Sequence, residues 1–304
     1  MAYLINTILG SLIPMCVTAI VTMAITLIFR TSFTTNFSQG VISAFGAYIA
    51  SSLVSKANLP IFLSLPLAMI VGMSLAMLVD VGIFRRGRYV NALGKQIITM
   101  GLISLITGAI PLIFGIADQY VISAFIPGNL SIELADGGRL NVTYNALVCF
   151  VITMALLSVI FCMLRFSKWG LSVRATASNE YVAGMMGINT HVVTAISWGL
   201  AGAIGTLAAV MKASNGEIIT GYFMTDYQVN AFLAGILGGF STFHGPVICA
   251  FIIPLLNNLI VYCLNTLGLN EYTGWSMVIV YAIALVIIFF KPQGIFGKKI
   301  ARKV

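Results

Sequence analysis

Long apolar runs recur along this chain and constrain its fold more than any other feature. We place nine such runs at about residues 8–29, 36–55, 60–83, 96–116, 144–166, 193–213, 226–243, 246–265 and 274–290. A helix of about 20 apolar residues crosses the ~30 Å hydrocarbon core of a bilayer. The runs therefore predict an all-α, polytopic membrane helix bundle of about 8–10 transmembrane helices. We expect a single transmembrane domain over residues 1–304.

Composition supports a membrane location and argues against a nucleic-acid partner. Hydrophobic residues make up 60% of the chain and charged residues only 8%, whereas a soluble domain carries about 25% charged residues. The net charge of +8 comes from basic residues scattered at the ends of apolar runs. This pattern is typical of membrane topology signals, and no basic patch interleaved with aromatic residues is available to nucleic acid.

The positions of the basic residues predict the orientation in the membrane. With nine spans and the first residue outside, the cytoplasmic segments contain Arg30, Arg85, Arg86, Arg88, Lys95, Arg165, Lys168, Arg174, Lys291, Lys298, Lys299, Arg302 and Lys303. Only Lys56, Arg139 and Lys212 fall outside. Because cytoplasmic loops are enriched in Lys and Arg, we expect a multi-pass protein with a cytoplasmic C-terminus, an inner loop at 167–192 and an outer loop at 117–143.

The inner loop contains a candidate short helix at about residues 178–186. Thr176 or Ser178 can cap its start, Glu180 complements the helix dipole, and Gly187 can supply a left-handed stop. One flank of this helix is apolar, formed by the pairs Tyr181/Met185 and Val182/Met186. So short a helix is unstable alone. It is explained either by docking to another protein or by lying on the bilayer surface.

Two runs are short and rich in glycine and alanine. They are "TNFSQGVISAFGAYIA" at 35–50 and "YQVNAFLAGILGGFSTFHGP" at 227–246. Paired segments of this kind in the two halves of a transporter indicate broken helices around a pathway, although close helix packing also favours small residues. Their neutral polar side chains are candidate pathway groups: Asn36, Ser38, Gln39, Gln228 and Asn230. Hydrogen bonds between helices explain the same residues about as well.

Enzyme chemistry finds little support in the sequence. The two histidines, His191 and His244, have no carboxylate at helical spacing, and the five cysteines lie inside apolar runs without metal-type spacing. No phosphate-binding loop of the G-x-x-x-x-G-K-[ST] type is present. Asp80 lies near the end of its span, and we expect it to form a surface ion pair with Arg85 and Arg86. We therefore expect a non-enzyme without a cofactor, whose energy comes from a partner.

The segment "RATASNEYVAGMMGINTHVV" resembles the R-A-x-A-x-N-x-x-x-A-x-x-M-G-I-N stretch of the permease subunits of bacterial branched-chain amino acid ABC transporters. Three further stretches match in the same order: "NFSQGVISAFGAYIA", "AFLAGILGGFSTFHGPVICA" and "KPQGIFGKK". Together they span nearly the whole chain. Val41 and Thr176 depart from the usual family residues, which leaves the substrate open.

The resemblance implies an importer in the bacterial plasma (inner) membrane. Its expected partners are a second permease subunit, identical or different, two cytoplasmic ATPase subunits that use ATP and Mg²⁺, an outer solute-binding protein, and the lipid bilayer. The inner loop would be the coupling helix that docks on an ATPase. The predicted coupling residues are Arg174, Asn179, Glu180, Ala183, Met186, Gly187 and Asn189.

The expected cargo is a branched-chain or related amino acid. A permease for urea or another amide, a sugar or a nucleoside shares the architecture and stays open as an alternative. An ion-coupled secondary transporter, or a scaffold that moves no solute, is the alternative from another class.

Overall fold

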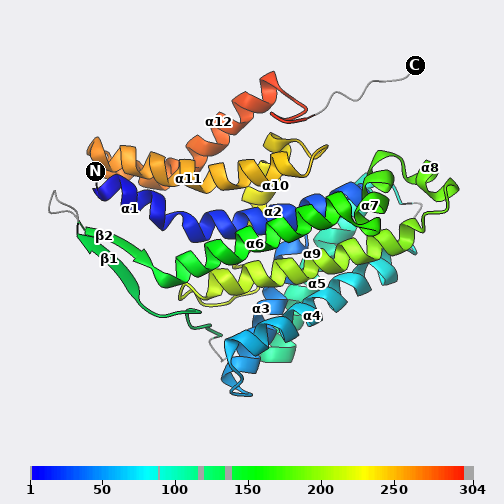
Figure 1. Ribbon diagram of the computed structural model, residues 1–304, viewed down its shortest axis with the longest axis horizontal. Helices are drawn as coiled ribbons and strands as arrows, with labels where there is room; N and C mark the ends of the chain where they lie inside the picture. Colours follow the sequence, from blue (N-terminus) through cyan, green and yellow to red (C-terminus); the bar gives the residue numbers. More distant parts are fainter. Residues whose placement is uncertain (1, 88–89, 116–119, 134–138, 298–304) are drawn as a thin grey trace.

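The computed structural model describes residues 2–87, 90–115, 120–133 and 139–297 (Figure 1). The helices are α1 (Ala2–Gly10), α2 (Leu12–Ser32), α3 (Gln39–Ser55), α4 (Ile61–Val79), the π-helical turn η1 (Asp80–Phe84), α5 (Ala92–Phe114), α6 (Tyr144–Phe166), α7 (Lys168–Ser178), α8 (Glu180–Met185), α9 (Thr190–Ala213), α10 (Thr225–Gly238), α11 (His244–Thr266), the 3₁₀ turn η2 (Asn270–Trp275) and α12 (Ser276–Phe290). The strands are β1 (Asn129–Glu133) and β2 (Arg139–Thr143).

The predicted membrane helix bundle is confirmed. Among the described residues, seven helical segments are long and apolar enough to span a membrane. Two of the predicted spans are shorter: α3 has 17 residues and α10 has 14. These are the two glycine-rich runs that the sequence marks as candidate broken helices. Several long helices, α2, α6, α9 and α11 among them, run along the long axis of the molecule, whereas α12 is inclined to it (Figure 1).

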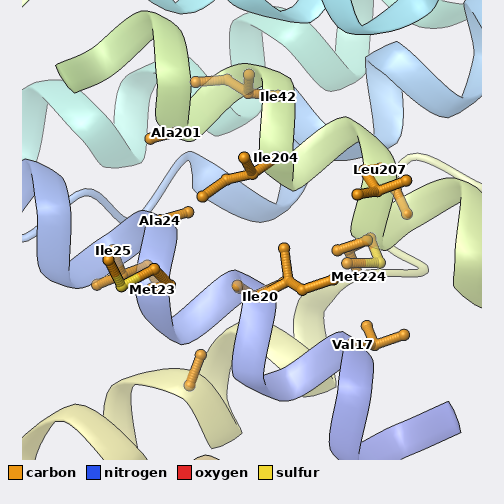
Figure 2. Packing of buried hydrophobic residues seen from close by; sticks show 14 of the residues in the cluster. Val17, Ile20, Met23, Ala24, Ile25, Ile42, Ala201, Ile204, Leu207 and Met224 are labelled. Atoms are coloured by element: carbon orange, nitrogen blue, oxygen red, sulfur yellow. The ribbon is translucent and has the colours of Figure 1, made fainter. Parts of the chain in front are cut away.

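Helix α2 forms the centre of the bundle. It contacts α6, α7, α9, α10 and α11, and every residue from Cys16 to Ile28 is buried. Figure 2 shows its side chains, Ile20 and Ala24 among them, facing Ile204 and Leu207 of α9. Its threonines Thr18, Thr22 and Thr26 are buried within the bundle together with the apolar residues, so no side of this part of α2 is left for lipid. The outer helices instead expose large apolar side chains, such as Leu112 of α5 and Phe289 of α12, as expected for a lipid-facing surface.

Helices α4 and α9 pack closely because small residues meet at their contact. Glycines stand at Gly72 in α4 and Gly202 in α9, and a Cβ atom on Gly202 would collide with the backbone carbonyl of Gly72. Within a lipid bilayer, such close backbone approach gives the dispersion contacts that hold helices together. The α4–α9 pair is therefore one of the tightest units of the bundle.

The two long loops lie at opposite ends of the bundle (Figure 1). At one end, β1 and β2 form an antiparallel hairpin in which Glu133 pairs with Arg139 and Asn129 with Thr143. The side chain of Asn6 in α1 holds this hairpin, since it donates to the Arg139 carbonyl (2.8 Å) and accepts from the Asn141 N–H (2.9 Å). Helices α7 and α8 lie at the other end, which we call the α8 end.

Some of the basic residues predicted to face the cytoplasm lie outside the described residues. These are Arg88, Lys298, Lys299, Arg302 and Lys303. The sequence "KPQGIFG" (291–297) that precedes the terminal lysines follows α12 and packs against the end of α10, where the Ile295 N–H donates to the Leu237 carbonyl at 2.7 Å. This contact fixes the α12 exit beside α10.

Candidate functional site: the α7–α8 loop and the short helices α3 and α10

Helix α7 is packed rigidly onto the bundle. The Ser167 side chain caps it by accepting from the Gly170 N–H at 2.9 Å. A Cβ atom on Gly170 would collide with the backbone of Met163 and Leu164, so glycine lets α7 fold back against the end of α6. Helix α7 also contacts α2 and α9, and Val173 is fully buried. A displacement of this helix would therefore be passed to three long helices.

The predicted start of the short helix in the inner loop is wrong. Thr176 and Ser178 belong to α7, and Thr176 is buried there rather than acting as a cap. The chain turns at Asn179, whose extended backbone ends α7 and whose side chain accepts from the Val182 N–H at 3.1 Å to start α8. Asparagine competes well with serine and threonine at this position because its carbonyl oxygen reaches the same orphan N–H groups. The loop thus holds two helices, and α8 has only six residues.

Helix α8 presents apolar side chains to its surroundings. The exposed fractions are 77% for Tyr181, 49% for Val182, 71% for Met185 and 80% for Met186. Ala183, in contrast, is 4% exposed, so one face of α8 is covered by the protein while the rest of the helix projects. Glu180 stands in the first turn, as predicted.

The exit from α8 follows the predicted left-handed stop. Gly187 has φ +86°, and the next N–H, of Ile188, donates back to the Ala183 carbonyl at 3.1 Å. This arrangement is the usual C-terminal stop of a helix at glycine. Asn189 then caps α9 by accepting from the Val192 N–H at 3.3 Å. Asparagine caps therefore start both α8 and α9.

The predicted coupling residues lie in one loop but do not share one surface. Arg174 lies on α7, where its guanidinium donates to the Arg165 carbonyl at 3.2 Å. Ala183 is buried, while Met186 and Gly187 are exposed. Asn179 and Asn189 act on the backbone as caps. Of the set, only Met186 contributes a large exposed apolar side chain.

Helix α3 begins deep inside the bundle. The Gln39 side chain at its start donates to the Ala201 carbonyl at 2.9 Å, and Ala201 stands near the midpoint of α9 (Thr190–Ala213). Asn36 organises the turn before α3: it accepts from the Ser38 N–H (3.0 Å) and hydroxyl (2.7 Å) and donates to Gln39 (3.2 Å). A helix start at this depth needs such side chains because no water is available there.

Helix α10 meets this start through Gln228. The side-chain carbonyl of Gln228 accepts from the Gly40 N–H, and its amide donates to the Phe37 carbonyl. Beside it, the rings of Phe37 and Phe232 pack at 5.0 Å. Asn36, Ser38, Gln39 and Gln228 therefore gather at the junction of α3 and α10, and all are buried. Each makes protein hydrogen bonds, so a role in a solute pathway stays a prediction.

Asn230 lies apart from this cluster. It is buried and accepts a hydrogen bond from the Tyr281 hydroxyl of α12 at 3.1 Å. The bond ties α10 to α12, which is the helix-to-helix role that the sequence left open for these residues.

Two charged residues are buried, which the sequence did not indicate. Asp80 is only 5% exposed, so the expected surface position is wrong. Lys212, predicted as an outer-loop residue, is 5% exposed. Its ammonium bonds the Phe223 carbonyl, pairs with Glu217 at 3.2 Å and lies 4.6 Å from the Tyr227 ring centroid. The local sequence carries no signal for this burial, because the rings of Phe223 and Tyr227 reach Lys212 only through the return of the chain.

Residues 7–288 match the family described as "Branched-chain amino acid transport system / permease component". The chain belongs to this permease family. The match extends from the first apolar segment into the ninth and contains the α7–α8 loop, α3 and α10, so it includes both regions described above. The match confirms the family resemblance and includes three of the four sequence stretches; the fourth, "KPQGIFGKK", follows residue 288.

Individual relatives agree with the family. The permease is 27% identical to a probable branched-chain amino acid transport permease protein LivH of Methanocaldococcus jannaschii, over 87% of this chain and 84% of that protein. It is 22% identical to the high-affinity permease protein BraD of Pseudomonas aeruginosa, over 87% and 85%. LivH of Escherichia coli is 23% identical over 71% of this chain and 65% of its own length. No solved structure matches the permease.

Proposed function

We propose that this permease is the membrane-spanning subunit of an ATP-driven importer of branched-chain or related amino acids. The family match and the names of the relatives support the substrate class. The observation that carries the mechanism is α8: a short helix that starts at the Asn179 cap and ends at the left-handed turn of Gly187. Three exposed apolar side chains of α8, with that of Met186 directly after it, project away from the bundle.

In this proposal α8 is the coupling helix. Six residues at 1.5 Å per residue make a rod of about 9 Å, too short to be stable in isolation. Docking of Tyr181, Met185 and Met186 into a cleft of an ATPase subunit would cover apolar surface that is otherwise exposed. Methionine suits such a contact because its flexible thioether adapts to the partner surface. Movement of α8 would reach α2, α6 and α9 through the tightly packed α7.

The remaining components follow from the same proposal. Two ATPase subunits bind ATP and Mg²⁺ at the α8 end, which faces the cytoplasm together with the C-terminus. A second permease subunit completes the translocation unit, and a solute-binding protein delivers the amino acid at the hairpin end. The permease itself uses no cofactor, binds no nucleic acid and resides in the bacterial plasma (inner) membrane.

A permease for another small polar solute is the second candidate. The ribose import permease protein RbsC of Escherichia coli is 28% identical, but over only 43% of this chain and 41% of its own length. The branched-chain amino acid relatives match 71% to 87% of the chain, which favours an amino acid. Competition of leucine uptake by ribose separates the two candidates.

Reconstituted transport tests the proposal. The permease complex in proteoliposomes should take up leucine only when ATPase subunits and ATP are present, and an ion gradient should not replace ATP. Met186→Glu should abolish this uptake, because it places a charge on the docking surface without touching the bundle core. Leu130→Glu on the exposed hairpin is the matched control for an apolar-to-charged change. Uptake driven by an ion gradient without ATPase subunits would overturn the proposal.

A further inference from the structure

Asp80 occupies an unusual position for an acidic residue. It directly follows α4 and begins the π-helical turn η1, within a segment long and apolar enough to span the membrane. Its side chain is almost completely buried. Charged residues are costly in such segments and are retained mainly where they serve function. Single π-helical turns are also frequent at functional sites, since they shift the register of a helix.

Asp80 faces a small polar cavity under the start of α8. The cavity has a volume of about 150 Å³. The charged and polar side chains on its wall include Asp80, Arg85, Lys95, Glu180, His191 and Thr194. These residues come from η1, the turn after it, α5, α8 and α9. Glu180 is the first residue of α8, so the cavity places the start of the coupling helix and the buried carboxylate of Asp80 around one shared space.

Two contacts join η1 to α9 beside this cavity. The Thr194 hydroxyl donates to the Asp80 carboxylate at 3.4 Å. One helical turn further along α9, the ring of Trp198 packs against Phe84 at 4.9 Å between centroids. Helix α9 follows α8 directly and contacts α2, α3 and α4. A change in the position of α8 therefore has a short physical route, through the cavity, into the tightly packed α4–α9 pair.

We propose that Asp80 is a positioning residue that couples the movement of α8 to the α4–α9 pair. When α8 moves, Glu180 shifts relative to Arg85, Lys95 and Asp80 across the cavity, and the charge of Asp80 makes η1 respond to this shift. The Asp80–Thr194 contact passes the response to α9. This inference rests on the proposed function, since it assigns a role within coupling by an ATPase.

The test measures leucine transported per ATP hydrolysed by the full complex in proteoliposomes. Asp80→Asn keeps the size and hydrogen-bonding oxygen of the side chain but removes its charge. Because coupling free energies between sites correspond to ~5–150-fold effects, we expect the ratio to fall about fivefold or more while ATP hydrolysis persists. Asp80→Glu, which restores the charge, should recover part of the ratio.

A matched control and a second variant keep the test decisive. Glu271→Gln removes an exposed carboxylate from η2, outside the hairpin, and should leave the ratio unchanged. Thr194→Val removes the hydroxyl contact but leaves the Asp80 charge, and should lower the ratio even if Asp80→Asn fails to assemble. A wild-type ratio in Thr194→Val or in assembled Asp80→Asn would overturn the inference. Absence of ATP-dependent uptake in the wild-type complex would instead overturn the proposed function.

Discussion

The side-chain carbonyl of Gln228 accepts a hydrogen bond from the backbone N–H of Gly40. This bond joins α10 to the start of α3, deep inside the bundle, although the two residues are 188 positions apart. A Cβ atom on Gly40 would lie within 2.6 Å of the Gln228 side-chain oxygen, so the close approach requires glycine. Helices α3 and α10, the two short helices that the sequence marks as a pair, are thus joined by the hydrogen bonds of Gln228.

Gln228→Leu should weaken this contact between α3 and α10. The change leaves the buried Gly40 N–H and Phe37 carbonyl without their partner, and each unsatisfied buried group costs about 1–3 kcal/mol. We expect the purified permease to unfold at a lower temperature and leucine uptake to fall. Gln228→Glu, which places a buried carboxylate against the Phe37 carbonyl in place of the amide donor, should lower the unfolding temperature at neutral pH at least as much, because a buried unpaired charge is costly. An unchanged unfolding temperature for Gln228→Leu would show that the hydrogen bonds of Gln228 do not stabilise the contact between α3 and α10.

Lys212→Met should loosen the loop between α9 and α10. Methionine preserves most of the packing against Phe223 and Tyr227 but removes the ammonium that bonds the Phe223 carbonyl. Hydrogen bonds from charged groups contribute about 1.5–3 kcal/mol. We therefore expect faster hydrogen exchange across residues 214–224.

Glu217→Gln is the control for the ion-pair partner of Lys212. The Glu217 side chain is 45% exposed, and ion pairs in water contribute only about 0–1 kcal/mol. Exchange in this loop should change little. If Glu217→Gln accelerated exchange as much as Lys212→Met, the ion pair rather than the carbonyl contact would hold the loop.

Gly187→Ala should destabilise the exit of α8 through the backbone alone. Gly187 has φ +86°, and a Cβ atom there would meet no neighbour within 4 Å, so no steric clash contributes. A non-glycine residue in this conformation costs roughly 1–2 kcal/mol. A spin label at Met186 should become more mobile, and uptake should fall.

Gly184→Ala is the matched control on the same helix. A Cβ atom on Gly184 also meets nothing within 4 Å, but Gly184 is helical, where alanine is favoured over glycine by about 1 kcal/mol. The label should therefore become less mobile in Gly184→Ala. Equal mobility in the two variants would show that the left-handed turn does not order α8.

Much of the fold could be predicted because a membrane helix is recognised from the length and hydrophobicity of one continuous stretch of sequence. The length of an apolar run that spans the bilayer is set by the bilayer, so helices are found at the nine expected places, the two short ones α3 and α10 included. The glycine stop at Gly187 is also a local signal. The helix start was misplaced because Thr176, Ser178 and Asn179 are all good caps, and only packing of α7 on the bundle decides among them.

The burial of Asp80 and Lys212 could not be predicted from local sequence. Each lies near the end of an apolar run, where a charge ordinarily reaches water. What buries Asp80 is α9, which supplies Thr194 from 114 positions away. What buries Lys212 is the return of the chain at Phe223 and Tyr227. Both depend on tertiary contacts rather than on periodicity.

The central claim, that α8 docks on an ATPase subunit, is tested most directly by cross-linking. A photo-crosslinking amino acid placed at Met186, which is 80% exposed directly after α8, should form a covalent adduct with the ATPase in membranes that contain the assembled complex. The same group at Leu130 on the hairpin should give no such adduct. Cross-linking of the Met186 position to lipid alone, with the ATPase present, would contradict the claim and would show that α8 lies on the bilayer surface.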